Sequence, residues 1–184
     1  MSRLNVPSPE DVPAGAQRIL DNVGAQLGFV PNMFKTIASN PTVLEVVTTL
    51  QGTLSRVLDA KTRHSIALAV SQANGCSYCL AIHTHVSTKF GGMSADDIEL
   101  GRAGSSVDPK RAAAARFAQR VVDSRGQVSD ADLAAVRGAG YTDSQILAIV
   151  ALSVQFLLTN FINNVNQTDI DIPGVGSADT AVAE

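Results

Sequence analysis

All three histidines and both cysteines of the 184-residue chain lie in one short stretch, from His64 to His85. Its centre is a Cys-x-x-Cys-x-x-x-His pattern made by Cys76, Cys79 and His83. On an α-helix these three positions fall within about 60° of one another around the axis, so their side chains are expected to share one face. His85 is expected on the opposite face. The spacing therefore places two thiols beside one imidazole.

This arrangement is suited to thiol redox chemistry. A Cys-x-x-Cys pair can close a disulfide within one helical turn, and only the thiolate form of a cysteine attacks. Cys76 lies at the start of the expected helix, where free amide groups and the positive helix end favour an anion. Cys79 lies one turn before His83, whose imidazole can accept the thiol proton. The pattern thus predicts a reversible disulfide.

Two other interpretations stay open. Two cysteines and two histidines can form a tetrahedral zinc site, in which His64 would be the fourth ligand of a binding or structural module. Two ligands within one helical turn, however, are not the common zinc-finger spacing. A disulfide reductase or redox sensor would use Cys76 and Cys79 without turning over a peroxide. For His64 alone, the plainest interpretation is a side chain on the solvent side of its helix.

The elements that must position these residues are helices, because no segment alternates with a period of two for long enough to predict a strand. Asp59 is expected to cap a helix that Asn74 and Gly75 end, and the cysteine helix follows at once. Thr142 and Gln145 form a capping-box pattern before a long apolar helix. The expected helices cover residues 13–27, 33–38, 41 to about 50, 59–73, 76–90, a short segment after Ser94, 109–125, 129–138 and 142–166, with a loop at 101–107.

The chain is expected to form one domain. Residues 1–12 make an N-terminal segment, residues 13–168 the helical domain, and residues 169–184 an extended tail. A weak similarity of residues 149–153 to residues 67–71 raises the alternative of two related helical halves. In that case only the first half would carry reactive groups, with one site in each chain.

Composition narrows the function classes. Hydrophobic residues make up 45% of the chain and charged residues 17%, as in a globular protein, and the net charge of −3 gives no case for nucleic-acid binding. No secretion or transit signal is recognised, so reduced thiols in the cytoplasm are expected. The apolar stretch at residues 146–162 is interrupted by polar residues and is expected to be buried, not membrane-spanning. Its uninterrupted apolar face, and that of residues 43–50, favour association of several copies.

The run from Lys61 to Ser71, followed by Asn74-Gly75-Cys76-Ser77-Tyr78-Cys79 and His83, resembles the alkylhydroperoxidase D / carboxymuconolactone decarboxylase family. The resemblance is strongest to its peroxidase-related branch and less to the decarboxylase branch, which generally lacks the cysteine pair. Weaker matching segments extend the resemblance over most of residues 8–173. These segments are Gly28-Phe29-Val30-Pro31-Asn32, Gly140-Tyr141-Thr142-Asp143 and Asn160-Phe161-Ile162-Asn163.

The resemblance implies an all-α, alkylhydroperoxidase-D-like helical bundle that forms homo-oligomers, commonly trimers or hexamers. It also implies a thiol peroxidase that reduces hydrogen peroxide or small organic hydroperoxides. In that role Cys79 would attack the peroxide and become a sulfenic acid, Cys76 would resolve it as a disulfide, and His83 would pass the proton. A dithiol carrier protein would reduce the disulfide. Neither haem, flavin nor metal is required.

One position departs from the family pattern. The family places a glutamate twelve residues before the first cysteine, and this chain has His64 there. A carboxylate would orient the His83 imidazole and stabilise its charged form, whereas a second imidazole is close to neutral at physiological pH. His64 is therefore expected to substitute as a base with a changed pH optimum, to weaken the peroxidase, or to serve as a fourth metal ligand.

Overall fold

The computed structural model describes residues 2–173, and within this range the regular structure is helical, with no strand. The predicted all-α fold is thus confirmed. The elements are a 3-10 turn, η1 (Pro9–Asp11), and the helices α1 (Ala14–Leu27), α2 (Asn32–Ile37), α3 (Pro41–Leu54), α4 (Ala60–Ala73), α5 (Ser77–Lys89), α6 (Ala95–Arg102), α7 (Pro109–Asp123), α8 (Asp130–Gly138) and α9 (Asp143–Asn166).

Side-chain caps begin several of these helices where the sequence predicts them. The Asp59 carboxylate accepts the Thr62 backbone N–H at 3.0 Å and begins α4. Thr142 and Gln145 bond each other's backbone N–H in a capping box at the start of α9. Because such caps satisfy amide groups that a helix leaves free, they define the first turn from local sequence alone.

Two glycines illustrate how the observed helix ends compare with the expected ones: the end of α6 differs from the prediction, and the end of α1 agrees with it. The predicted loop at 101–107 begins two residues too early, because α6 continues through Gly101 to Arg102. A Cβ on Gly101 would lie 3.0 Å from Leu68 Cδ1, so this glycine serves the close approach of α6 to α4. Gly28, with φ of 83°, ends α1 in the left-handed conformation, as expected.

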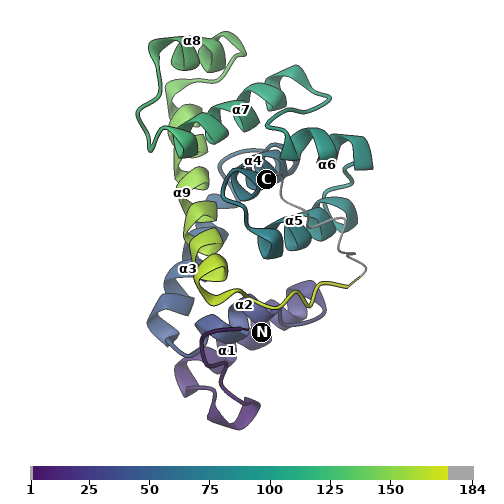
Figure 1. Cartoon of the computed structure of the whole chain (residues 1–184), viewed down its shortest axis with the longest axis vertical. Helices are drawn as coiled ribbons and strands as arrows, with labels where there is room; N and C mark the ends of the chain where they lie inside the picture. The colour runs from purple at the N-terminus through teal and green to yellow at the C-terminus, as the bar shows by residue number, and fades with distance from the viewer. Residues whose placement is uncertain (1, 174–184) are drawn as a thin grey trace.

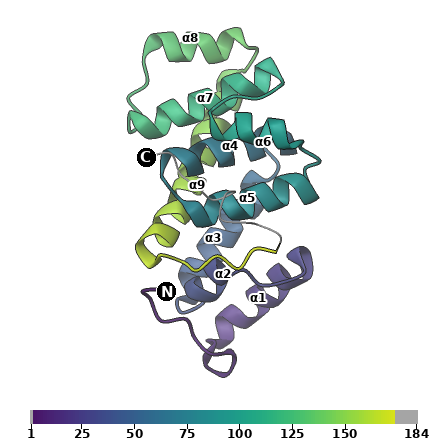
Figure 2. The same cartoon turned by 45° about the vertical axis from the view of Figure 1, so that its right-hand side comes forward.

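The helices are arranged around α4 and along α9. The helix α4 contacts α5, α6, α7 and α9, and its residues 65–71 are buried without interruption. In Figure 1, α7 and α8 lie at one end of the long axis and α1, α2 and α3 at the other, while α9 runs beside both groups. Figure 2 shows α5 and α6 on the same level as α4. The fold thereby holds the cysteine helix α5 against the centre of the molecule.

The apolar interior has two main parts. One joins α4, α7 and α9 around Phe117, Ile149 and Leu152. The other joins the N-terminal helices to α5, and it contains Cys76, Cys79 and Tyr78. The cysteine pair is therefore part of a packed core and not of an exposed turn.

The helix α9 is long and apolar enough to cross a membrane by length and composition, and it is the one such helix within the described range. Its buried side includes Gln155, Asn160, Asn163 and Asn166. These side chains face protein, but only 44% of the most apolar window is buried, so the prediction of a buried segment is confirmed for one side of the helix only. The helix α9 has no break at residues 156–157, which correspond to the turn between α4 and Cys76, so the weak internal similarity does not extend to a repeated helix-turn-helix.

Residues 168–172 form an extended segment that passes between α2 and α5, drawn in yellow in Figures 1 and 2. Asp171 accepts hydrogen bonds from the Tyr78 hydroxyl at 3.0 Å and from the Asn32 N–H at 2.9 Å. Ile172 is buried in the same core as the cysteines. The predicted extended tail agrees with the structure up to residue 173; its remainder, residues 174–184, lies outside the described residues.

Candidate functional site

The cysteine helix begins with a tight turn. Gly75 adopts a φ of 60°, which other residues rarely adopt, and the Cys76 N–H donates to the Ser71 carbonyl at 3.0 Å. Cys76 itself is the N-cap of α5, and its Sγ accepts the Cys79 backbone N–H at 3.4 Å. The turn and the cap together place the Cys76 sulfur over the first turn of the helix, next to Cys79.

Both cysteines are free thiols, and each is only 1% exposed. The pKa of Cys76 is lowered, chiefly by a hydrogen bond from the Cys79 thiol and, against the effect of burial, by the backbone N–H groups of Cys79 and Tyr78. Burial raises the pKa of Cys79 well above its usual value, and the neighbouring Cys76 raises it further. The helix start thus favours an anion on Cys76, as predicted, while Cys79 holds its proton more firmly.

Cys79 faces the buried side of α9. Asn163 Nδ2 donates to Cys79 Sγ at 3.3 Å and to the Thr159 carbonyl at 2.9 Å. Asn160, one turn earlier, donates to Ser71 Oγ at 3.3 Å. Sequence reasoning used these asparagines only as part of a resemblance. Their recurrence every three residues within an apolar helix was the signal that a polar, buried face lies there.

The two histidines of interest meet at a cavity of about 200 Å³ between α3, α4, α5 and α9. The His83 ring lies edge-on to Phe156, with 5.1 Å between ring centroids. The cavity is lined by Gln51, Leu54, Ser55, Arg63, His64, Ala67, His83, Val86, Leu152, Gln155 and Phe156, a set of described residues that includes no carboxylate. His64 therefore lies on the inner side of α4 and not in bulk solvent.

Burial keeps both imidazoles neutral. It lowers the pKa of His83 to about 3, with a smaller contribution from His64. Burial also lowers the pKa of His64, and the Arg63 charge adds to this effect. The His64 ring packs against Gly91, where a Cβ would lie 2.8 Å from His64 Cδ2. A neutral His83 can accept a proton, but the described residues that line the cavity include no carboxylate that would stabilise the resulting cation.

The structure brings the predicted residues together as two adjoining pairs. Cys76 and Cys79 contact each other at the start of α5, and His64 and His83 share the cavity one turn further along. The cysteines do not line that cavity; Cys79 lies one helical turn before His83, which does. His85 lies apart, edge-on to Phe29 at 6.4 Å, in agreement with its predicted opposite face.

The zinc interpretation finds no support in this geometry. Within residues 2–173, no group of three or more His, Cys, Asp or Glu side chains is arranged to hold a metal ion. The four residues proposed as ligands are divided between a sulfur pair and an imidazole pair.

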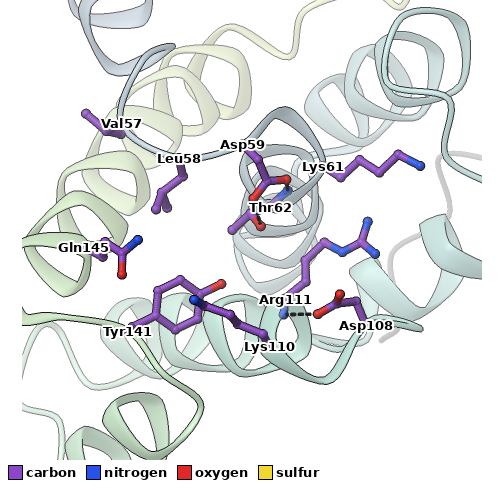
Figure 3. Close-up of a pocket in the computed structure, with 10 residues that line it drawn as sticks. All are labelled: Val57, Leu58, Asp59, Lys61, Thr62, Asp108, Lys110, Arg111, Tyr141 and Gln145. Atoms are coloured by element: carbon purple, nitrogen blue, oxygen red, sulfur yellow. Dashed lines mark hydrogen bonds between the residues drawn. The ribbon is translucent and has the colours of Figure 1, made fainter.

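A larger cavity of about 410 Å³ lies near the starts of α4, α7 and α9 (Figure 3). Four of its five charged side chains have partners; the fifth is Lys61. Asp59 and Asp108 cap their helices, Arg111 pairs with Asp97 at 3.1 Å, and Lys110 lies 4.9 Å from the centre of the Tyr141 ring. Neither a cysteine nor a histidine lines it, so it is separate from the thiol site.

Solved structures with the same arrangement of helices define the class of fold. An uncharacterized peroxidase-related protein from Ralstonia eutropha JMP134, described as an alkylhydroperoxidase AhpD core, superposes with a TM-score of 0.83, at 24% identity over 98% of this chain and 95% of that one. A peroxidase-related protein from Silicibacter sp. TM1040 gives 0.81, at 23% identity over 94% of each chain. The debrominase Bmp8 in complex with 2,3,4-tribromopyrrole gives 0.79, at 18% identity over 93% and 92%. At these identities the likeness shows an AhpD-like fold.

A family model matches the central segment of the sequence. The model of the carboxymuconolactone decarboxylase family matches residues 41–123, which contain Cys76, Cys79, His83 and His64. The resemblance drawn from the cysteine motif, to the alkylhydroperoxidase D / carboxymuconolactone decarboxylase family, is thereby confirmed. No curated protein matches the chain significantly.

Proposed function

We propose that this protein is a thiol peroxidase that reduces hydrogen peroxide or small organic hydroperoxides through a reversible Cys76–Cys79 disulfide. The observation that carries the proposal is the pair of free, contacting thiols beside a small cavity that His83 lines. A metal or organic cofactor is not needed for this chemistry, because sulfur itself is oxidised and reduced.

Cys79 is the attacking thiol in this proposal. It lies one helical turn from His83, whereas Cys76 lies nearly two turns away, so a peroxide in the cavity approaches Cys79 first. Its raised pKa means that the proton must be removed during the reaction. The neutral imidazole of His83 is the acceptor, and Cys76, whose sulfur carries the anion more readily, is the second acceptor within the pair.

The steps balance as follows. The Cys79 thiolate attacks the terminal peroxide oxygen; an S–O bond forms, the O–O bond breaks, and the leaving alkoxide takes the proton that His83 had accepted. Cys76 then attacks the sulfenic sulfur, an S–S bond forms, and hydroxide leaves as water with the Cys76 thiol proton. Two thiols and one hydroperoxide thus give one disulfide, one alcohol and one water. A dithiol carrier protein returns the disulfide to two thiols.

The thiol and peroxide balance tests this function directly. The reduced protein is expected to lose two thiols for each peroxide consumed. Cys79→Ser should abolish peroxide consumption, while Cys76→Ser should consume one equivalent and leave a sulfenic acid that dimedone traps. Consumption that persists in Cys79→Ser would reverse the two roles, and stoichiometric zinc protecting both thiols would defeat the proposal.

The same assay separates other reactions. Disulfide formation without peroxide turnover would indicate the reductase or sensor alternative. Since one structural neighbour is a debrominase, incubation of the reduced protein with 2,3,4-tribromopyrrole is the matched control. Release of bromide with loss of two thiols, in the absence of peroxide consumption, would assign that reaction instead.

We also propose that the chain works as a homo-oligomer, a trimer or hexamer, in the cytoplasm. A reducing compartment supports the proposal, because there the two buried thiols return to the reduced state after each cycle. The exposed apolar residues of α9, considered below, support association.

A further inference from the structure

The buried face of α9 contains an asparagine that the peroxidase steps above do not use. Asn163 is 2% exposed, and its Nδ2 lies 3.3 Å from Cys79 Sγ. It is thus a side chain from another helix that touches the sulfur proposed to react.

The orientation of this amide is determined by a second contact. Nδ2 also donates to the Thr159 carbonyl at 2.9 Å, and a carbonyl oxygen can only accept. If the amide were turned over, Oδ1 would face that carbonyl, and two acceptors would oppose each other. The group that Asn163 presents to Cys79 is therefore an N–H donor.

A donor facing sulfur favours the thiolate, because an anion accepts a hydrogen bond more strongly than a neutral thiol. Burial and Cys76 raise the pKa of Cys79, and the Asn163 and Asn160 amides are the contributions that lower it. The described residues around His83 include no carboxylate that would stabilise its imidazolium form. The Asn163 amide instead stabilises the Cys79 thiolate directly.

The other atom of the same amide is also available. Asn163 Oδ1 is buried and has no hydrogen-bond partner among the described residues. An unpaired buried acceptor is costly, and native proteins retain one only rarely. When Cys79 gains an oxygen, its S–O–H hydroxyl brings a donor to the neighbourhood of this atom.

We propose that Asn163 stabilises both sulfur states of Cys79: its Nδ2 donates to the thiolate, and its Oδ1 accepts from the sulfenic acid hydroxyl. The first half stands on the contact with Cys79 alone. The second half rests on the proposed peroxidase function.

The thiolate half is tested in a Cys76→Ser background, where Cys79 is the single thiol and serine keeps the helix cap. The rate of alkylation by iodoacetamide is measured against pH, after thermal melting confirms the fold. Asn163→Leu is expected to raise the midpoint by about one to two pH units, the effect of losing a hydrogen bond to a charged group. An unchanged midpoint would overturn the proposal.

Asn166→Leu is the matched control. Asn166 is also fully buried on α9, but it bonds the Leu4 backbone, Thr36 and Thr168, and no cysteine. The alkylation midpoint of Asn166→Leu should equal that of the Cys76→Ser parent. An equal rise in Asn163→Leu and Asn166→Leu would mean that either substitution loosens the helix, and would reject the specific role of Asn163.

A second pair covers a failure of the leucine variants to fold. Asn163→Asp keeps the side-chain size, removes the donor and adds a negative charge, so the midpoint should rise at least as far. Asn164→Asp adds the same charge one residue away, where the native side chain is exposed and bonds the Asn74 carbonyl. If the two variants have equal midpoints, the proposal is wrong.

The acceptor half is read from the lifetime of the sulfenic acid, followed by dimedone trapping after one equivalent of hydrogen peroxide. Asn163→Leu should shorten it, and Asn163→Asp, which keeps an acceptor oxygen, should preserve it; equal lifetimes would reject this half. Alkylation does not involve peroxide. The two proposals can therefore fail separately. If the wild-type protein shows no peroxidase activity but Asn163→Leu still raises the alkylation midpoint, the proposed function is rejected and the thiolate role of Asn163 is retained.

Discussion

At the scale of single residues, the site differs from what the family resemblance implies at His64. The resemblance implies a glutamate at this position, and in this structure His64 shares the cavity with His83. Both imidazoles are neutral, because burial lowers the pKa of each. His83 can therefore receive a proton only at a high cost in free energy, which would slow the proposed activation of Cys79.

His64→Glu is accordingly expected to raise peroxide turnover, on the order of tenfold, because a carboxylate beside His83 stabilises the imidazolium that forms during proton transfer. The measurement is the initial rate of peroxide consumption with excess dithiol. His64→Gln is the control, since it changes size without adding charge, and its rate should not rise. Equal rates for the two variants would show that position 64 lies outside the relay.

The same two histidines predict a dependence of stability on pH. An unfolded histidine titrates near pH 6.5, whereas burial lowers the folded pKa of His83 to about 3. Below pH 6.5 the unfolded state thus binds protons that the folded state does not, so stability is lost as pH falls from 6.5 toward 3. His64, shifted in the same direction, adds to this loss.

Urea unfolding at pH 7.5 and pH 5.0 measures this effect. The loss at pH 5.0 is expected to be up to about 2 kcal/mol for His83, from about 1.4 kcal/mol for each pH unit below the unfolded pKa. His83→Gln should reduce the difference between the two pH values. A wild-type free energy of unfolding that is equal at both would contradict a buried, neutral His83.

At the scale of elements, α9 presents two different faces. Its buried side carries the asparagines that contact Ser71, Cys79 and Thr36. Its other side exposes large apolar residues at intervals of seven, four, three and four positions; they are Leu147, Val154, Leu158, Phe161 and Val165. That spacing forms one continuous stripe on a helix, and Val121 and Val122 of α7 line an apolar cavity of about 610 Å³ beside it.

We expect this stripe to be buried against other copies of the chain. Replacing both Val154 and Phe161 by lysine should dissociate the oligomer, because charges would enter an apolar contact. Sedimentation velocity measures the mass, and Val107→Lys, at an exposed apolar residue outside the stripe, is the control. A double variant with the mass of the wild type would place the interface elsewhere.

Local sequence predicted most elements because their boundaries depend on neighbours. The Asp59 cap, the Thr142–Gln145 box and the Gly28 stop each lie where the pattern places them. Gly101 was expected in a loop because glycine commonly breaks helices. Its helical position follows instead from the approach of Leu68, a contact between two elements that the local pattern does not contain.

At the scale of the whole molecule, residues near both limits of the described range, 2–173, lie near the site. The Arg3 N–H donates to the carbonyl of Asn166 at the end of α9. Asp171 ties the following extended segment to Tyr78, the residue between the two cysteines. Because Ile172 enters the same core as Cys76 and Cys79, residues distant in sequence share in covering the thiols.

The sequence by itself determined the helices, the adjacency of Cys76 and Cys79, and the placing of His85 away from them, since these depend on spacing within one helix. Only the tertiary structure decided that His64 meets His83 at a cavity, that Asn163 touches the Cys79 sulfur, and that Cys79 holds its proton more firmly than Cys76. The reason is that partners and burial come from the packing of separate helices, whose relative placement no local pattern records.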